Sequence, residues 1–109
     1  MKFAIFFTLK PETINAAMER PSDRSAVVGA LLQAAGGTLD AYYWMFGKHD
    51  GMVIVDVPDS ASAAAVSLAV SSTGAFAHLE TNELIPADEI QPLLERAKAA
   101  RSQYTPPGS

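Results

Sequence analysis

The fold of this chain is decided by residues 38–57, which read TLDAYYWMFGKHDGMVIVDV. The aromatic run 38–46 and the valine-rich run 52–57 are both typical of β-strands. A short connection with a glycine at each end, Gly47 and Gly51, separates them. Such a connection predicts an antiparallel hairpin, so the two strands should be neighbours in one sheet.

The patterns on either side of this hairpin predict the remaining elements. Strands are expected at 2–9 and 76–84, and helices at 11–20, 22–35, 63–70 and 86–102. Strand–helix–strand–strand–helix–strand order with right-handed crossovers predicts an α+β fold, the ferredoxin-like βαββαβ sandwich. The last helix is an addition to that plan. We expect one domain over residues 1–103 and a flexible tail over residues 104–109.

Composition excludes several classes of function. The net charge of −4, from 8 Lys+Arg against 12 Asp+Glu, leaves no basic patch for nucleic acid or for an anionic membrane surface. No apolar stretch is long enough to span a bilayer, and the short apolar start reads as a strand rather than a signal peptide. The chain has no cysteine, which excludes disulfides and thiolate chemistry. The expected location is the cytoplasm.

Alternation along the strands gives the predicted sheet two apolar faces. The valines of strand 52–57 form one face, which the helices should cover. The opposite face carries Phe6, Met52 and Ile54, and is too apolar to lie against water. We expect the same face of a second copy to cover it, giving a homodimer through the sheet. The alternative is a monomer that tolerates some exposed apolar surface.

Polar side chains are set into this second face. In strand 76–84, alternation places Phe76, His78, Glu80 and Asn82 on one side. The pattern does not decide whether Tyr42, Trp44 and Phe46 or Tyr43 and Met45 face the helices. We expect a partly polar, aromatic-lined cavity between the sheet and its cover. Its expected lining is Phe6, Thr8, Trp44, Asp56, His78 and Glu80.

Several segments of the chain occur together in one known pattern: 21–24 (PSDR), Gly36-Gly37, 43–50 (YWMFGKHD), the apolar strand 52–57 and Pro58-Asp59. Together they resemble the GYD domain family, which is bacterial and named for a Gly-Tyr-Asp signature. The resemblance covers about residues 1–85 and implies a dimeric α/β-barrel related to the ferredoxin-like fold, with no agreed catalytic residues.

The signature maps onto Gly47, His49 and Asp50, with histidine where the family usually has tyrosine. Two interpretations are open. The motif shapes the turn, with Gly47 at positive φ and Asp50 bonding to the backbone, which is the interpretation we favour. Otherwise the ring at position 49 packs or binds, and His49 adds a titratable group.

The chemistry that these residues suggest is limited. His78 is the best candidate for acid/base chemistry, and Glu80 or Asp56 could orient it. The simpler interpretation is that His78 makes its hydrogen bonds within the dimer interface and has no catalytic role. No metal is expected, because the histidines and acids do not have the spacing of known metal sites. No cofactor is expected, because the sequence has no phosphate-binding loop and no dinucleotide-binding loop. Arg24 is expected to cap or pair on the surface rather than bind an anion. The expected ligand-binding residues are Phe6, Thr8, Tyr42, Trp44, His49 and His78.

Two classes of function therefore remain. The first is a dimeric, non-catalytic module that binds a small molecule, for example a small aromatic ligand, or a partner protein. The second is a cofactor-independent oxygenase or isomerase of an aromatic or quinone-like substrate, suggested by analogy between folds. An open cavity lined by His78 and an acid would favour the enzyme.

Overall fold

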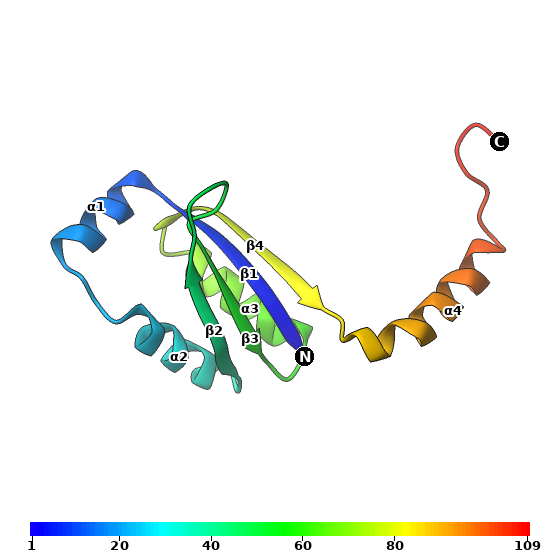
Figure 1. Ribbon diagram of the computed structural model, residues 1–109, viewed down its shortest axis with the longest axis horizontal. Coiled ribbons are helices and arrows are strands. Elements are labelled where there is room, and N and C mark those ends of the chain that lie inside the picture. The colour runs from blue at the N-terminus through cyan, green and yellow to red at the C-terminus, as the bar shows by residue number, and fades with distance from the viewer.

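The computed structural model describes all of residues 1–109 and has an α+β fold, as predicted (Figure 1). Its sheet has four antiparallel strands in the order β2-β3-β1-β4, which is the ferredoxin-like arrangement. The hairpin read from the sequence is confirmed, since β2 pairs with β3. The strands are β1 Lys2–Leu9, β2 Thr38–Trp44, β3 Gly51–Asp56 and β4 Phe76–Leu84.

Three helices lie on one side of the sheet: α1 Pro11–Glu19, α2 Arg24–Ala34 and α3 Ser60–Ser71. α2 and α3 contribute buried side chains to the core, whereas α1 contributes none. Both α2 and α3 have an aspartate N-cap, because the side chain of Asp23 accepts from the backbone of α2 and that of Asp59 accepts from the backbone of α3. The Asp59 cap starts α3 earlier than the predicted residue 63. Gly36, at a φ of 81°, ends the α2 segment, because glycine adopts this left-handed conformation without a steric cost.

The core lies between the sheet and these helices. Val55 and Leu32 are each 1% exposed and form its centre, and other inward side chains of β1 and β3 pack around them. α2 and α3 add few buried side chains of their own, so the helix layer covers the sheet loosely. The complete buried cluster is Phe3, Ile5, Phe7, Leu32, Val53, Val55, Val57, Ala63 and Val66.

Two irregularities decide which side chains face the helices. In β2 the register shifts between Leu39 and Ala41, so that Leu39 and Tyr42 both pack against the core. This settles the side of β2 that the alternation left open. In β1 the register against β4 shifts between Thr8 and Leu9, which pairs Leu9 with Phe76.

The second shift corrects one prediction. Phe76 does not share a face with His78, Glu80 and Asn82, because the extra residue turns its ring to the helix side. There it meets Phe7 edge-on, with ring centroids 5.8 Å apart. Alternation holds only within an unbroken ladder, and the shift lies just where Phe76 begins its strand.

No helix covers the other face of the sheet. Phe6, Met52 and Ile54 lie on this face half-buried, and the Tyr43 side chain at its edge is 61% exposed. We call this the open face. Its apolar content agrees with the face pattern read from the sequence.

The last helical segment projects away from the rest of the molecule (Figure 1). It consists of a 3-10 turn, Ala87–Glu89, and α4, Ile90–Arg101, instead of one helix over 86–102. α4 buries none of its residues, and its apolar side chains Ile90, Leu93 and Leu94 are exposed. The radius of gyration is consequently 17.6 Å, against about 13 Å for a compact domain of this length. None of the helices has the length and apolar content needed to cross a membrane.

Candidate functional site

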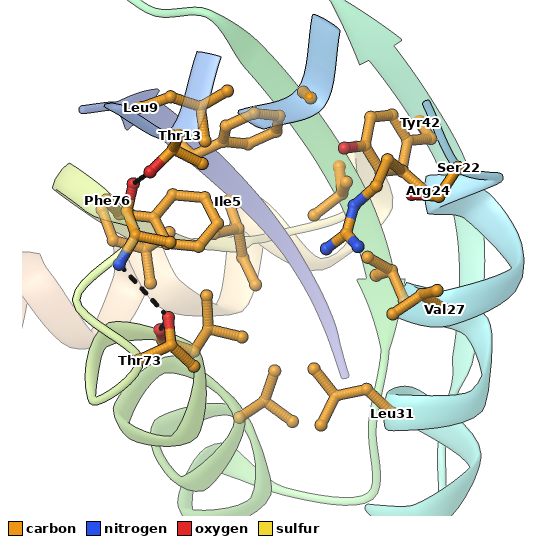
Figure 2. A pocket seen from close by; sticks show the side chains of 18 of the residues that line it. Ile5, Leu9, Thr13, Ser22, Arg24, Val27, Leu31, Tyr42, Thr73 and Phe76 are labelled. Atoms are coloured by element: carbon orange, nitrogen blue, oxygen red, sulfur yellow. Dashed lines mark hydrogen bonds between the residues drawn. The ribbon is translucent and has the colours of Figure 1, made fainter. Parts of the chain in front are cut away.

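A large cavity lies between the sheet and the three helices (Figure 2). Its volume is about 800 Å³, and 19 of its 26 lining residues are hydrophobic. α1 and α2 form one wall, with Ala17 and Leu31 among their contributions, while Val70 belongs to the α3 wall. The cavity exists because the helices spread over the sheet without closing on it. Ligand sites are concave spaces of this kind, largely apolar with few polar groups.

Aromatic rings form the sheet-side wall of the cavity. Phe7 is at the centre, with ring centroids 6.0 Å from Tyr42, 5.6 Å from Trp44 and 5.8 Å from Phe76. All three contacts are edge-on, a favourable geometry for aromatic pairs. Gly51 makes the position of Phe7 possible, because a Cβ there would lie 2.2 Å from the Phe7 ring.

The ionisable groups that line the cavity are Arg20, Arg24 and Tyr42. Figure 2 shows the Arg24 side chain extending from the start of α2 into the cavity beside Tyr42. Burial raises the pKa of Tyr42, whereas the charge and hydrogen bonding of Arg24 act in the opposite direction. The phenol is therefore held in its neutral form beside a guanidinium.

The hydroxyls on the opposite wall bond to the chain itself. Thr13 Oγ1 donates to the carbonyl of Ala75 at 2.6 Å, and the Ala75 N–H donates to Thr73 Oγ1 at 3.4 Å (Figure 2). These bonds connect α1 and the end of α3 to the start of β4. They stabilise the positions of the elements that form this wall of the cavity.

The structure divides the expected ligand-binding residues between two sites. Tyr42 and Trp44 line the cavity under the helices. The other four belong to the opposite side of the sheet or to the adjoining loop, and do not line this cavity. Trp44 therefore does not join them in the cavity that was expected between the sheet and a second copy. The four are Phe6, Thr8, His49 and His78.

On the open face, the rings of Phe6, His49 and His78 form a row. His49 lies 5.2 Å from Phe6 and stacks on His78 at 6.4 Å, between ring centroids. The His49 Nδ1 atom is buried without a hydrogen-bond partner. No group of three or more metal-binding side chains forms here or elsewhere in the structure.

The proposed acid/base set is brought together only in part, because Glu80 lies beside His78 whereas Asp56 does not. Asp56 pairs in the sheet with Lys2, whereas His78 pairs with Thr8, six residues further along β1. That separation is about 20 Å along a strand. Asp56 instead contacts the N-terminal amine at 3.2 Å. Glu80 is on the same side of β4 as His78, but none of these three lines the cavity.

Arg24 is exposed, as expected, but it makes no ion pair and its side chain also lines the cavity. Arg24 precedes Val28 by four residues, so both lie on one side of α2. The same spacing that marked Val28 as inward could have marked Arg24. Arg20, the C-cap of α1, follows the same spacing, because it comes four residues after Ala16 and three after Ala17, which also line the cavity.

The family of this chain follows from comparison with models of known protein families. The model of the GYD domain matches residues 3–94. The chain belongs to the GYD domain family. Among curated protein sequences, none matches this GYD domain.

Among solved structures, the GYD domain is similar to 5-chloro-2-hydroxyhydroquinone dehydrochlorinase from Burkholderia phenoliruptrix AC1100, in complex with 2,5-dihydroxybenzoquinone. The TM-score is 0.54 at 11% sequence identity, and the match covers 81% of this chain and 97% of that chain. The two proteins therefore share a fold.

The signature turn of this GYD domain is built around Asp50. Its carboxylate accepts a hydrogen bond from the Leu9 N–H at 2.7 Å, and its own N–H donates to the Phe7 carbonyl at 2.8 Å. Gly47 has a φ of 152°, as the turn interpretation expects. His49, at the position usually held by tyrosine, contacts Phe6 through its ring. The motif thus joins the β2–β3 loop to the end of β1.

Proposed function

We propose that this GYD domain binds a small molecule in the cavity between its sheet and its helices. The observation that carries the proposal is the cavity itself, about 800 Å³ with mostly apolar walls. Binding pockets for small organic molecules are about 300–1,000 Å³ and have this composition. An apolar ligand would remove those walls from water, which is the main favourable term in such binding.

The ligand class proposed here is a small aromatic or quinone-like molecule. Phe7, Trp44 and Phe76 present ring edges and faces to the cavity, on which a planar ligand can stack. The complex of the structurally similar dehydrochlorinase with 2,5-dihydroxybenzoquinone supports a ring-sized ligand.

Trp44 is the single tryptophan of the chain and lines the cavity, so its fluorescence can report binding. Titration of the full chain with menadione should give saturable quenching. Val27→Phe, which adds bulk to the cavity wall, should weaken binding severalfold. The matched control is Leu68→Phe, because Leu68 is 71% exposed and does not line the cavity. Quenching that does not saturate, or that Val27→Phe leaves unchanged, would count against the proposal.

We also propose that the domain works as a homodimer through the open face. Phe6, Met52 and Ile54 are half-buried there with no helix over them, and α4 carries exposed apolar side chains for a second contact. Sedimentation at micromolar concentration should give about twice the chain mass. Ile54→Asp should give monomers, whereas Leu68→Asp on the exposed side of α3 should leave the dimer intact. A wild-type chain that sediments as a monomer would exclude this assembly.

A second candidate function is cofactor-independent catalysis, as an oxygenase or isomerase. The observation in its favour is the phenol of Tyr42 beside the guanidinium of Arg24 in the cavity. Such a pair can donate a proton and hold negative charge on a substrate oxygen. His78, Glu80 and Asp56 would take no part, because they lie outside this cavity. Turnover of a hydroquinone that is lost in Tyr42→Phe and kept in Tyr43→Phe would support catalysis.

The proposed setting is the cytoplasm of a bacterium, with residues 1–103 as a single domain and residues 104–109 as a flexible tail. Limited proteolysis should remove the tail first and leave the rest intact. Cleavage within the β2–β3 loop at a similar rate would contradict this division.

A further inference from the structure

Most polar groups that line the cavity are of two kinds, and the first kind, three hydroxyls from α1, α3 and the end of α3, already bonds within the protein. Thr13 Oγ1 donates to the Ala75 carbonyl at 2.6 Å, and Thr73 Oγ1 donates to the Val70 carbonyl at 2.7 Å. The Ser67 hydroxyl donates to a carbonyl of its own helix at 3.0 Å. These hydroxyl groups already donate their hydrogen bonds to backbone carbonyls, so this wall offers few donors to a ligand.

The second kind is the cationic wall, which we define as Arg20, Pro21, Ser22 and Arg24. Arg20 ends α1 and Arg24 begins α2. Neither arginine makes an ion pair with a carboxylate. The three ion pairs of the structure all join Met1 or Lys2 to acidic side chains at the far end of β1. No carboxylate of the chain therefore neutralises either guanidinium group.

The charge of the cavity is opposite to that of the whole chain. The chain has 12 acidic residues and a net charge of −4, yet no aspartate, glutamate or histidine lines the cavity. Its only charged lining groups are the two arginines. A cavity with apolar walls concentrates the field of the cations at its edge. The arrangement therefore complements a ligand with an apolar body and one negatively charged end.

We infer that the cavity binds an apolar organic anion, whose carboxylate or phenolate oxygen lies at the Arg24 guanidinium and the Tyr42 hydroxyl. This inference rests on the proposed function and adds the charge of the ligand and its orientation. The planar fork of an arginine matches a carboxylate through two parallel hydrogen bonds, and a neutral tyrosine hydroxyl adds a third donor. The ring of the ligand then lies toward Phe7 and Phe76, deeper under the helices.

Arg24 is largely exposed, so water weakens its attraction for an anion. A charge-assisted hydrogen bond at such a site is expected to raise affinity by about tenfold rather than by thousands. This magnitude sets the scale of the test.

The test compares naphthoate with naphthamide, which have the same ring and differ in charge. Calorimetric titration of the full chain should show naphthoate binding about tenfold more tightly than naphthamide. Arg24→Gln should bring the ratio of the two affinities close to one. The matched control is Arg96→Gln, because Arg96 lies on the projecting helix α4 and does not line the cavity. It should keep the wild-type ratio.

Each failure has a distinct meaning. Equal affinity of the wild-type chain for the two ligands, or a preference that survives Arg24→Gln, would overturn the anion inference and leave the proposed function standing. A preference lost equally in Arg96→Gln would also overturn it, because overall charge and not the cationic wall would then be responsible. If the wild-type chain binds neither ligand, both the inference and the proposed binding function are rejected. Circular dichroism of each variant checks that it is folded.

Discussion

Asp50 and Leu9 are joined by a hydrogen bond of 2.7 Å, from the backbone N–H of Leu9 to the Asp50 carboxylate. The bond forms at the register shift of β1, which pairs Leu9 with Phe76. Asp50 thus connects the signature turn to the irregularity that turns Phe76 into the cavity. The family signature and the cavity wall are parts of one local structure.

Replacing Asp50 should therefore destabilise the fold. Asp50→Ala removes a charge-assisted bond to a backbone N–H, and we expect the free energy of unfolding to fall by about 1.5–3 kcal/mol. Urea unfolding followed by circular dichroism measures the change. Asp88→Ala is the control, since Asp88 is exposed and no hydrogen bond of its side chain is present. Equal stability of the two variants would show that the Asp50 bond contributes little.

Gly51 should not tolerate a side chain. A Cβ at this position would lie 2.2 Å from Phe7 Cζ and 2.9 Å from the Tyr43 carbonyl oxygen. Gly51→Ala should lower the free energy of unfolding by about 1–3 kcal/mol through overpacking. Gly29→Ala is the opposite case, because nothing lies within 4 Å and the residue is inside α2. That change should raise stability by about 0.5–1 kcal/mol. Thermal unfolding of both variants measures the two changes, and a change in the same direction for both would contradict the prediction.

Leu32 should be the most sensitive helical position in the core. It is 1% exposed and packs on the sheet valines. Leu32→Ala should reduce the free energy of unfolding by about 2–5 kcal/mol, by loss of buried surface and by cavity formation. Leu68→Ala, at a side chain that is 71% exposed, should change it by no more than about 0.5 kcal/mol. A small effect at Leu32 would mean that α2 is not held against the sheet.

Tyr42 should make stability depend on alkaline pH. Burial raises its pKa above the ordinary 10.0, so the unfolded chain loses this proton at lower pH than the folded chain. Its stabilising contribution is complete below pH 10.0 and is lost as the pH rises through the folded-state pKa. Denaturant unfolding above and below pH 10.0 should show a smaller alkaline loss in Tyr42→Phe than in the wild-type chain. The control is Tyr43→Phe, at a ring that is 61% exposed.

Local patterns were enough to predict the elements of this fold. The hairpin of residues 38–57 and the apolar inner face of β3 depend on nearest neighbours and on a period of two. The physical causes of these features act between residues that are close in the chain, so the features can be predicted from a single sequence. The open face with Phe6 and Ile54 followed from the same alternation.

The cavity depended on contacts that no local pattern contains. The shift between Thr8 and Leu9 turns Phe76 inward, and the packing of α1 and α2 places the two arginines at one wall. Strand register put Asp56 at the far end of the sheet from His78, although both belong to the open face. The sequence by itself determined the strands, the helices and the apolar faces, because these follow from backbone geometry and side-chain polarity. The tertiary structure decided which residues meet, because register and helix placement depend on packing between distant segments.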